Sequence, residues 1–167
     1  MAPRRLRTRW PKRSKAHGAW GILRCSRRPS RAARLLARHG RRAEARSLLD
    51  EVRSLCRRAA GTYPWQPEFL LAFAALDARE EHRALLAGEP PSVGLDAAIA
   101  VCDRDYARAI ELYEQMDSVT QMAETRLLAA VDGVISDSEL ARAVDFFRSV
   151  GAAARVREAE ALLHASA

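Results

Sequence analysis

Histidine, cysteine and acidic side chains are the groups in this chain that could hold a metal or act as nucleophiles. The three cysteines form no Cys-x-x-Cys pair, and no histidine lies at ligand spacing from any of them. The densest group is Glu80, Glu81 and His82, but adjacent residues of a helix point in different directions and cannot converge on one ion. We therefore expect His82 on a solvated helix face, and we expect no metal and no cofactor.

Motifs of nucleotide-binding and hydrolytic enzymes are absent from the sequence. The chain has only two lysines, Lys12 and Lys15, and neither lies in a Gly-x-x-x-x-Gly-Lys-Ser/Thr loop. No Gly-x-Gly-x-x-Gly, Gly-x-Ser-x-Gly or His-Glu-x-x-His pattern occurs. Asp103 and Asp105 flank Arg104 at a predicted helix junction, where capping a helix is a commoner role for Asp than acid–base catalysis. These absences predict a protein that is not an enzyme.

The cysteine count and the hydropathy pattern predict a cytoplasmic protein. An odd and sparse set of cysteines fits a reducing compartment better than a disulfide scaffold, and Cys56 falls on a predicted apolar helix stripe. The longest apolar run, Phe69–Leu76, is far shorter than the roughly 20 residues that cross a bilayer. The basic start contains no apolar stretch long enough for a secretory signal. We expect no membrane partner.

Charge is divided unevenly along the 167 residues. Residues 1–58 hold 19 Lys and Arg against 3 Asp and Glu, a net charge of +16, whereas residues 59–167 hold 9 against 18, a net charge of −9. Such asymmetry is typical of a tail with a role of its own joined to a folded body. The acidic body favours a protein or peptide partner with a basic segment, which could be the chain's own tail.

Residues 1–29 are predicted to be a disordered, Arg-rich extension, because Pro and Gly interrupt every possible helix and positive charges repel one another. Three interpretations remain open: an unstructured extension without a role of its own, an organelle transit peptide, and a nucleic-acid-binding tail. In the last case, positive charges would contact phosphates and an indole would stack on bases. The candidate contacts are Arg4, Arg5, Arg7, Arg9, Trp10, Lys12, Arg13 and Lys15.

From Ser30 onward, apolar spacing predicts an all-α chain without sheet. Ser30 is expected to cap a helix that ends near Gly40, and Pro64 and Pro67 are expected to start a helix ahead of a break at residues 88–91. One helix between these two has an apolar face made of Ala45, Leu48, Leu49, Val52, Leu55 and Cys56.

Helix ends in the second half of the chain are marked by capping signals. Ser118 and Ser136, each with Gln or Glu three residues later, fit capping boxes. Gly133 and Gly151 lie where left-handed C-caps belong. In all, about eight helices are expected over residues 30–167, with one near Ser92 to Asp103.

A short pattern recurs along the chain. The segment Tyr106–Tyr113 matches Leu140–Phe147 in residue character at every position. A third copy lies upstream in Gly40–Leu49, where Ala45 aligns with Ala109 at a distance along the sequence close to twice the first offset. A recurring offset of this kind is a sign of a helical-repeat array.

These residues resemble the tetratricopeptide repeat, a family built from pairs of antiparallel helices with a period of about 34 residues, which the offset matches. The resemblance implies stacked pairs over residues 30–167, an α-solenoid whose concave surface binds protein segments. It also implies that a small Ala lies where the two helices of a pair cross, and that larger residues fill the space to the next pair. The residues in these roles are Ala45, Leu49, Tyr106, Ala109, Tyr113, Leu140, Ala143 and Phe147. The alternative is a helical bundle without repeats, since amphipathic helices share this pattern by necessity.

The last part of the chain has a second, narrower resemblance. Four segments are similar to the C-terminal helical-repeat tails of large actinobacterial regulators with cyclase and ATPase domains: Asp105–Ala107, Ala123–Ala130, Phe146–Ala152 and Arg157–Ala167. The resemblance covers less than half of the chain, at its C-terminal end. It implies a non-catalytic interaction module, a stand-alone or truncated piece of such a regulator. The alternative function is nucleic-acid binding through the Arg-rich tail.

Overall fold

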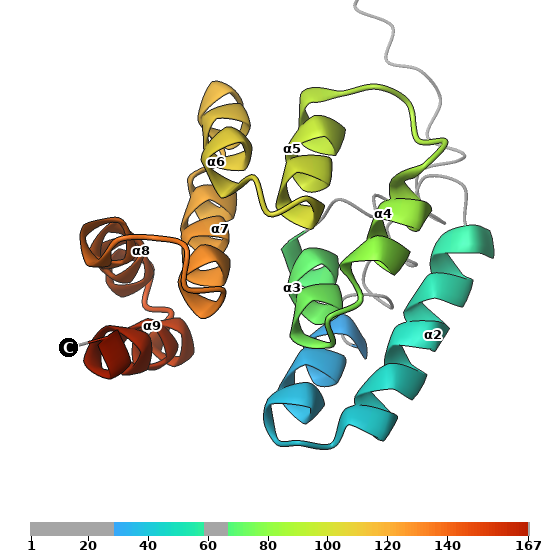
Figure 1. Ribbon diagram of the computed structural model, residues 1–167, viewed down its shortest axis with the longest axis horizontal. Helices are drawn as coiled ribbons and strands as arrows, with labels where there is room; N and C mark the ends of the chain where they lie inside the picture. Colours follow the sequence, from blue (N-terminus) through green and yellow to red (C-terminus); the bar gives the residue numbers. More distant parts are fainter. Residues whose placement is uncertain (1–28, 59–66, 167) are drawn as a thin grey trace, which may run out of the picture.

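The computed structural model describes residues 29–58 and 67–166, and these residues form helices and no strand. The all-α prediction is therefore confirmed for the described part of the chain (Figure 1). The eight predicted contacts between Arg4 and Lys15 lie outside the described residues. A helix over residues 29–38 is followed by α2 (Arg42–Arg58), α3 (Pro67–Ala75), α4 (Arg79–Leu86), α5 (Val93–Cys102), α6 (Tyr106–Gln115), α7 (Val119–Val131), α8 (Asp137–Ser149) and α9 (Ala153–Ser166).

Each helix from α3 to α9 packs against the next one in the chain. In addition, α3 contacts α5 and α7, and α7 contacts α9. Figure 1 places α2 at one edge of the molecule and α8 and α9 at the opposite edge. The helices α3, α7 and α9 thus form a continuous row of contacts that ends at this edge.

The apolar core follows the chain in three clusters. The first joins the 29–38 helix to α2 and α3, the second joins α3 to α7, and the third joins α7, α8 and α9. Small residues are frequent in all three, because Ala lets helices approach closely at low entropic cost. All eight residues that the repeat pattern singled out are buried: Ala45, Leu49, Tyr106, Ala109, Tyr113, Leu140, Ala143 and Phe147. Their burial fits the predicted faces, and their roles in a repeat stay a prediction.

Six helix ends share one turn, in which a residue with positive φ is followed by an amide that bonds back to a carbonyl five residues earlier. The residue with positive φ is glycine at positions 40, 133 and 151, where the sequence predicted helix ends. At the other three ends the residue is Asp77, Arg104 or Asp117. A non-glycine residue in this conformation is uncommon, and Asp is among the residues that tolerate it best.

The turn at Asp77 divides the segment between Pro67 and the break at residues 88–91 into two helices, α3 and α4. The sequence did not mark this division, because neither Gly nor Pro lies there. Two backbone hydrogen bonds stabilise the turn. The amide of Asp77 donates to the carbonyl of Ala74 at 3.0 Å, and the amide of Ala78 donates to the carbonyl of Phe73 at 2.8 Å. As a result, α4 turns back and brings His82 over the core.

Helix caps agree with the sequence at most of the predicted positions. The side chain of Ser136 accepts from the amide of Glu139 at 3.4 Å, and that of Asp105 accepts from the amide of Arg108 at 3.1 Å. The prediction of a capping box at Ser118 is wrong. Its hydroxyl makes no cap bond and donates instead to the carbonyl of Met116 at 3.4 Å.

Candidate functional site

A cavity of about 440 Å³ lies between the 29–38 helix and the row of α3, α7 and α9. It combines charged and apolar side chains drawn from distant parts of the described chain. Four arginines, two glutamates and four smaller or apolar residues line it. These are Arg31, Arg34, Arg38, Arg155, Glu124, Glu158, Leu35, Leu71, Thr120 and Ala154.

The positions of the arginines follow from the helix period. Arg31, Arg34 and Arg38 are spaced by three and four residues, so they share one face of the 29–38 helix. Another face of this helix buries Ala33 and packs Leu36 against the cluster of α2 and α3. Packing of the apolar face therefore fixes the rotation of the helix and turns the arginines towards α7 and α9.

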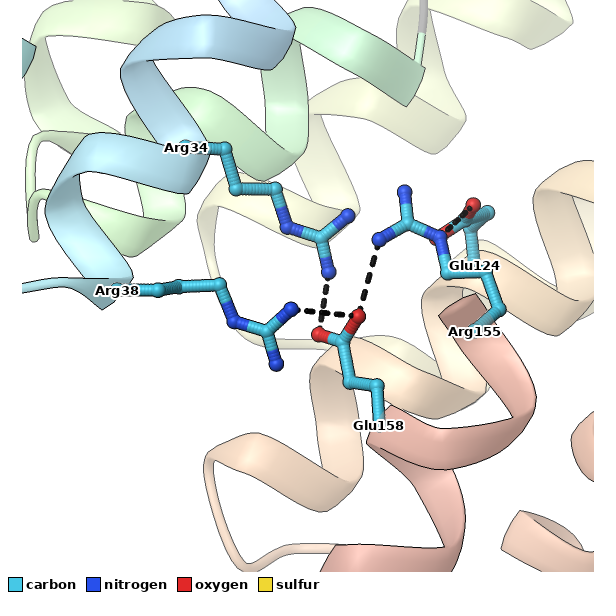
Figure 2. A network of polar contacts seen from close by, with 5 residues as sticks. All are labelled: Arg34, Arg38, Glu124, Arg155 and Glu158. Carbon is cyan, nitrogen blue, oxygen red and sulfur yellow. Dashed lines mark hydrogen bonds and ion pairs between the residues drawn. The ribbon is translucent and has the colours of Figure 1, made fainter. Parts of the chain in front are cut away.

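Glu158 of α9 is the centre of the cluster (Figure 2). Its carboxylate accepts from Nη2 of Arg34 at 2.5 Å and pairs with Nη1 of Arg38 at 2.9 Å. Arg155, one turn earlier on α9, contacts Glu158 through Nη1 at 3.1 Å and donates from Nε to Glu124 of α7 at 2.7 Å. Three guanidinium groups thus converge on one carboxylate, and the 29–38 helix is joined directly to α9.

Burial makes this cluster electrostatically unusual. The side chains of Glu158 and Arg34 are only 4% and 12% exposed. Burial lowers the pKa of Arg34, and the charges of Glu158 and Glu124 offset part of that effect while Arg38 adds to it. Because four arginines face two glutamates, the lining carries a formal net charge of +2. The cavity therefore favours an anion.

Leu35 gives the cavity an apolar side. More than half of its side-chain surface is exposed, although a leucine is ordinarily buried. Leu71 of α3 and Ala154 of α9 also line the space. An anionic ligand with an apolar portion would therefore find both kinds of contact here.

A second buried arginine, Arg79, lies at the start of α4. Arg79 donates from Nη1 to the carbonyl of Val101 at 3.2 Å and from Nη2 to Asp132 at 2.8 Å. Asp132 also accepts from the hydroxyl of Tyr106, whose ring lies 5.8 Å from the Arg79 guanidinium carbon. Burial is the main reason that the pKa of Tyr106 is raised, and the bond to Asp132 adds to it. This cluster ties α4, α5, α6 and α7 together.

His82 is not on a solvated helix face, contrary to the prediction. It is buried, its ring stacks on Phe73 with centroids 4.6 Å apart, and its Nδ1 lies 3.6 Å from Sγ of Cys102. The helix buries Arg79, His82 and Leu86, which share one face at helical spacing. That spacing was a readable signal, but two adjacent glutamates made the segment look polar all round.

Cys102 has the surroundings of a structural thiol. Burial raises its pKa to about 12, so the thiolate that a nucleophile needs is not formed near neutral pH. Within residues 29–58 and 67–166, no group of three His, Cys, Asp or Glu side chains is placed to hold a metal ion. Over the same residues, no helix combines the length and the apolar character needed to cross a membrane.

Sequence reasoning did not single out the residues of the cavity. The regular spacing of Arg31, Arg34 and Arg38 was visible, but it belonged to a long basic region in which nearly all charged residues are positive. Glu158 lies 124 residues beyond Arg34, and no local pattern connects the two. Comparison with protein families, with curated proteins and with solved structures found no match to this chain.

Proposed function

We propose that this chain is a non-catalytic protein–protein interaction module, built from tetratricopeptide-like helix pairs, whose cavity receives an acidic segment of a partner protein. The observation that carries the proposal is the excess of arginine over glutamate in a cavity lined by the 29–38 helix, α3, α7 and α9. In an array of stacked pairs, alternate helices line the concave face, where partners bind.

The turns between helices support the repeat interpretation. The amide of Ser118 bonds to the carbonyl of Tyr113 at 2.9 Å, and the amide of Ala152 bonds to that of Phe147 at 2.8 Å. The spacing between these two bonds along the chain equals the spacing between the matching sequence segments. Ala109 and Ala143, at equivalent positions in α6 and α8, are both fully buried.

The charge of the cavity, and not that of the whole chain, indicates the sign of the partner's charge. The net charge of −9 over residues 59–167 predicts a basic partner. Recognition, however, depends on the charges that face the ligand, and those in the cavity sum to +2. An acidic segment is therefore the better match. The similarity of the last part of the chain to regulator tails fits a module that docks onto a signalling protein.

Fluorescence polarisation with labelled peptides of matched length tests this proposal. The full chain is expected to bind an Asp- and Glu-rich peptide with an apolar residue more tightly than a Lys-rich one. Replacing Arg34 and Arg38 by Gln should abolish the difference. The matched control is Arg108→Gln with Arg142→Gln, which removes the same charge from exposed positions of α6 and α8.

The same assay with short DNA and RNA tests the alternative function. Tight binding that falls steeply with salt and disappears when Arg4, Arg5, Arg7 and Arg9 are replaced by Gln would favour a nucleic-acid-binding tail. Equal binding of acidic peptides by the cavity and control variants would contradict the interaction proposal.

A further inference from the structure

The guanidinium groups around Glu158 have more donors than the acceptors beside them can use. Each guanidinium carries five N–H groups on three nitrogens. Towards Glu158, Arg34 uses only Nη2 and Arg38 only Nη1. Both side chains line the cavity, so a ligand in it would meet their guanidinium groups. Surplus donors around a buried carboxylate indicate that a second anion belongs there.

The charge of the lining favours a dianion over a single carboxylate. Four arginines and two glutamates leave an excess of two positive charges. Arginine forks match the oxygens of a phosphate group, which accepts several N–H bonds at once. Burial already disfavours the charge on Arg34, and a bound anion would relieve that cost.

The size of the cavity indicates what the ligand contains besides its phosphate group. A volume of about 440 Å³ has room for about 15 water molecules at some 30 Å³ each, so a phosphate group would fill only part of it. Leu35, Leu71 and Ala154 line the remainder. The ligand therefore carries an apolar or aliphatic portion next to its phosphate.

We infer that the cavity binds a phosphate monoester, held by Arg34 and Arg38 on one side and by Arg155 on the other, beside the Glu158 carboxylate. The phosphate is either carried by a side chain of a partner protein or part of a small phosphorylated compound. The inference deepens the proposed function and rests on it only where the phosphate belongs to a protein.

Isothermal titration calorimetry on the full chain with three probes separates these sources. The probes are inorganic phosphate, a phosphoserine peptide with flanking apolar residues, and the same peptide without the phosphate. If the ligand is a phosphorylated side chain, the phosphopeptide is expected to bind about tenfold or more tighter than its unphosphorylated twin, because charge-assisted bonds are the strong ones. If it is a small compound, inorganic phosphate should bind and neither peptide should.

Variants test whether binding occurs in the cavity. Arg38→Gln alters a half-exposed side chain and should leave the fold intact, as circular dichroism can verify, yet weaken binding of phosphate-bearing probes by about tenfold. Glu124→Gln keeps an acceptor for Arg155 and raises the net charge of the lining, so it should tighten binding, which a purely structural cluster would not do. Arg108→Gln is the control.

Three results would overturn the inference: no binding of any phosphate-bearing probe, equal binding by Arg38→Gln and wild type, or weaker binding by Glu124→Gln. The proposed function would survive these results if unphosphorylated acidic peptides still required Arg34 and Arg38. Conversely, phosphate binding without any peptide binding would leave a small-molecule site and refute the interaction proposal.

Discussion

The clusters around Arg79 and around Glu158 both contain buried arginine, but the arginines have different roles. Around Arg79, one arginine meets one aspartate, one main-chain carbonyl and one tyrosine hydroxyl. Around Glu158, three arginines share one carboxylate, and among the described lining residues Glu124 is the one other acid. The depression beside Arg79 is lined by three acids and two arginines, so its formal charge is −1, whereas the cavity beside Glu158 carries +2.

The comparison indicates that the balance of charge separates a packing arginine from a binding arginine. At Arg79, one aspartate and one main-chain carbonyl bind a buried arginine, which joins helices together although its Nε has no hydrogen-bond partner. Where arginines outnumber the acids of a cavity lining, the excess positive charge attracts an anionic ligand. Four predictions test this distinction.

Replacing Arg79 by Met is expected to have the largest effect, a loss of about 3 kcal/mol in the free energy of unfolding, because the buried charge of Asp132 would be left with the exposed Arg104 at 3.7 Å and the Tyr106 hydroxyl. Urea denaturation followed by circular dichroism measures it. Replacing Arg83, an exposed residue of the same helix that pairs with Asp103, is the control and should cost less than about 0.5 kcal/mol. A cost for Arg79→Met as small as the control's would remove the structural role of this cluster.

Ala109→Leu tests the packing beside the Arg79 cluster, one turn after Tyr106. Ala109 is fully buried, so a larger side chain would overpack the contact at a cost of about 2 kcal/mol. Arg108→Leu, at the exposed neighbour, should change stability by less than about 0.5 kcal/mol. Ala143→Leu in α8 should behave as Ala109→Leu does. The register of the repeat would be wrong if only one of the two alanines were sensitive.

Alkaline pH should destabilise the region near Arg79 more than the cavity, because no Tyr or Cys is among the described residues that line the cavity. Burial raises the pKa of Cys102 from 9.0 to about 12 and also raises those of Tyr106 and Tyr113. Groups with raised pKa values hold more protons folded than unfolded, so stability is intact below pH 9.0 and falls above it. The expected loss is about 1 kcal/mol per unit of pH for each group that has ionised in the unfolded chain and not yet in the folded one.

Denaturation curves at several pH values measure this slope. Cys102→Ala should make it shallower, because one of the three buried acids is removed. Binding at the cavity should keep its affinity until unfolding begins. A slope unchanged by Cys102→Ala would mean that the thiol does not contribute to the pH dependence of stability.

Arg34→Met should have the smallest effect on stability, about 1 kcal/mol or less, because Glu158 keeps Arg38 and Arg155 as partners. The same variant should lose ligand binding, which sets it apart from Arg79→Met. Thermal unfolding and the peptide assay measure the two effects. A stability loss as large as that of Arg79→Met would mean that the arginines of both clusters mainly join helices, and it would weaken the case for a ligand.

Local sequence determined much of the fold. Apolar periodicity located the helices and their buried faces, Ala109 and Ala143 among them, because the helix period puts residues three and four apart on one side. Gly133, Gly151, Asp105 and Ser136 marked helix ends correctly, since caps depend on a few adjacent backbone groups. The division at Asp77 was not visible, because aspartate adopts the left-handed turn without the glycine that normally signals it.

Only the tertiary structure decided which helices meet. Periodicity says that a face is buried but not what covers it, so His82 could be placed against Phe73 and Cys102 only once α4 was seen to turn back over the core. In the same way, Arg34 and Glu158 are 124 residues apart in sequence and 2.5 Å apart in space. The cavity exists because packing brings the 29–38 helix against α7 and α9, and that contact depends on the shapes of all the helices between them.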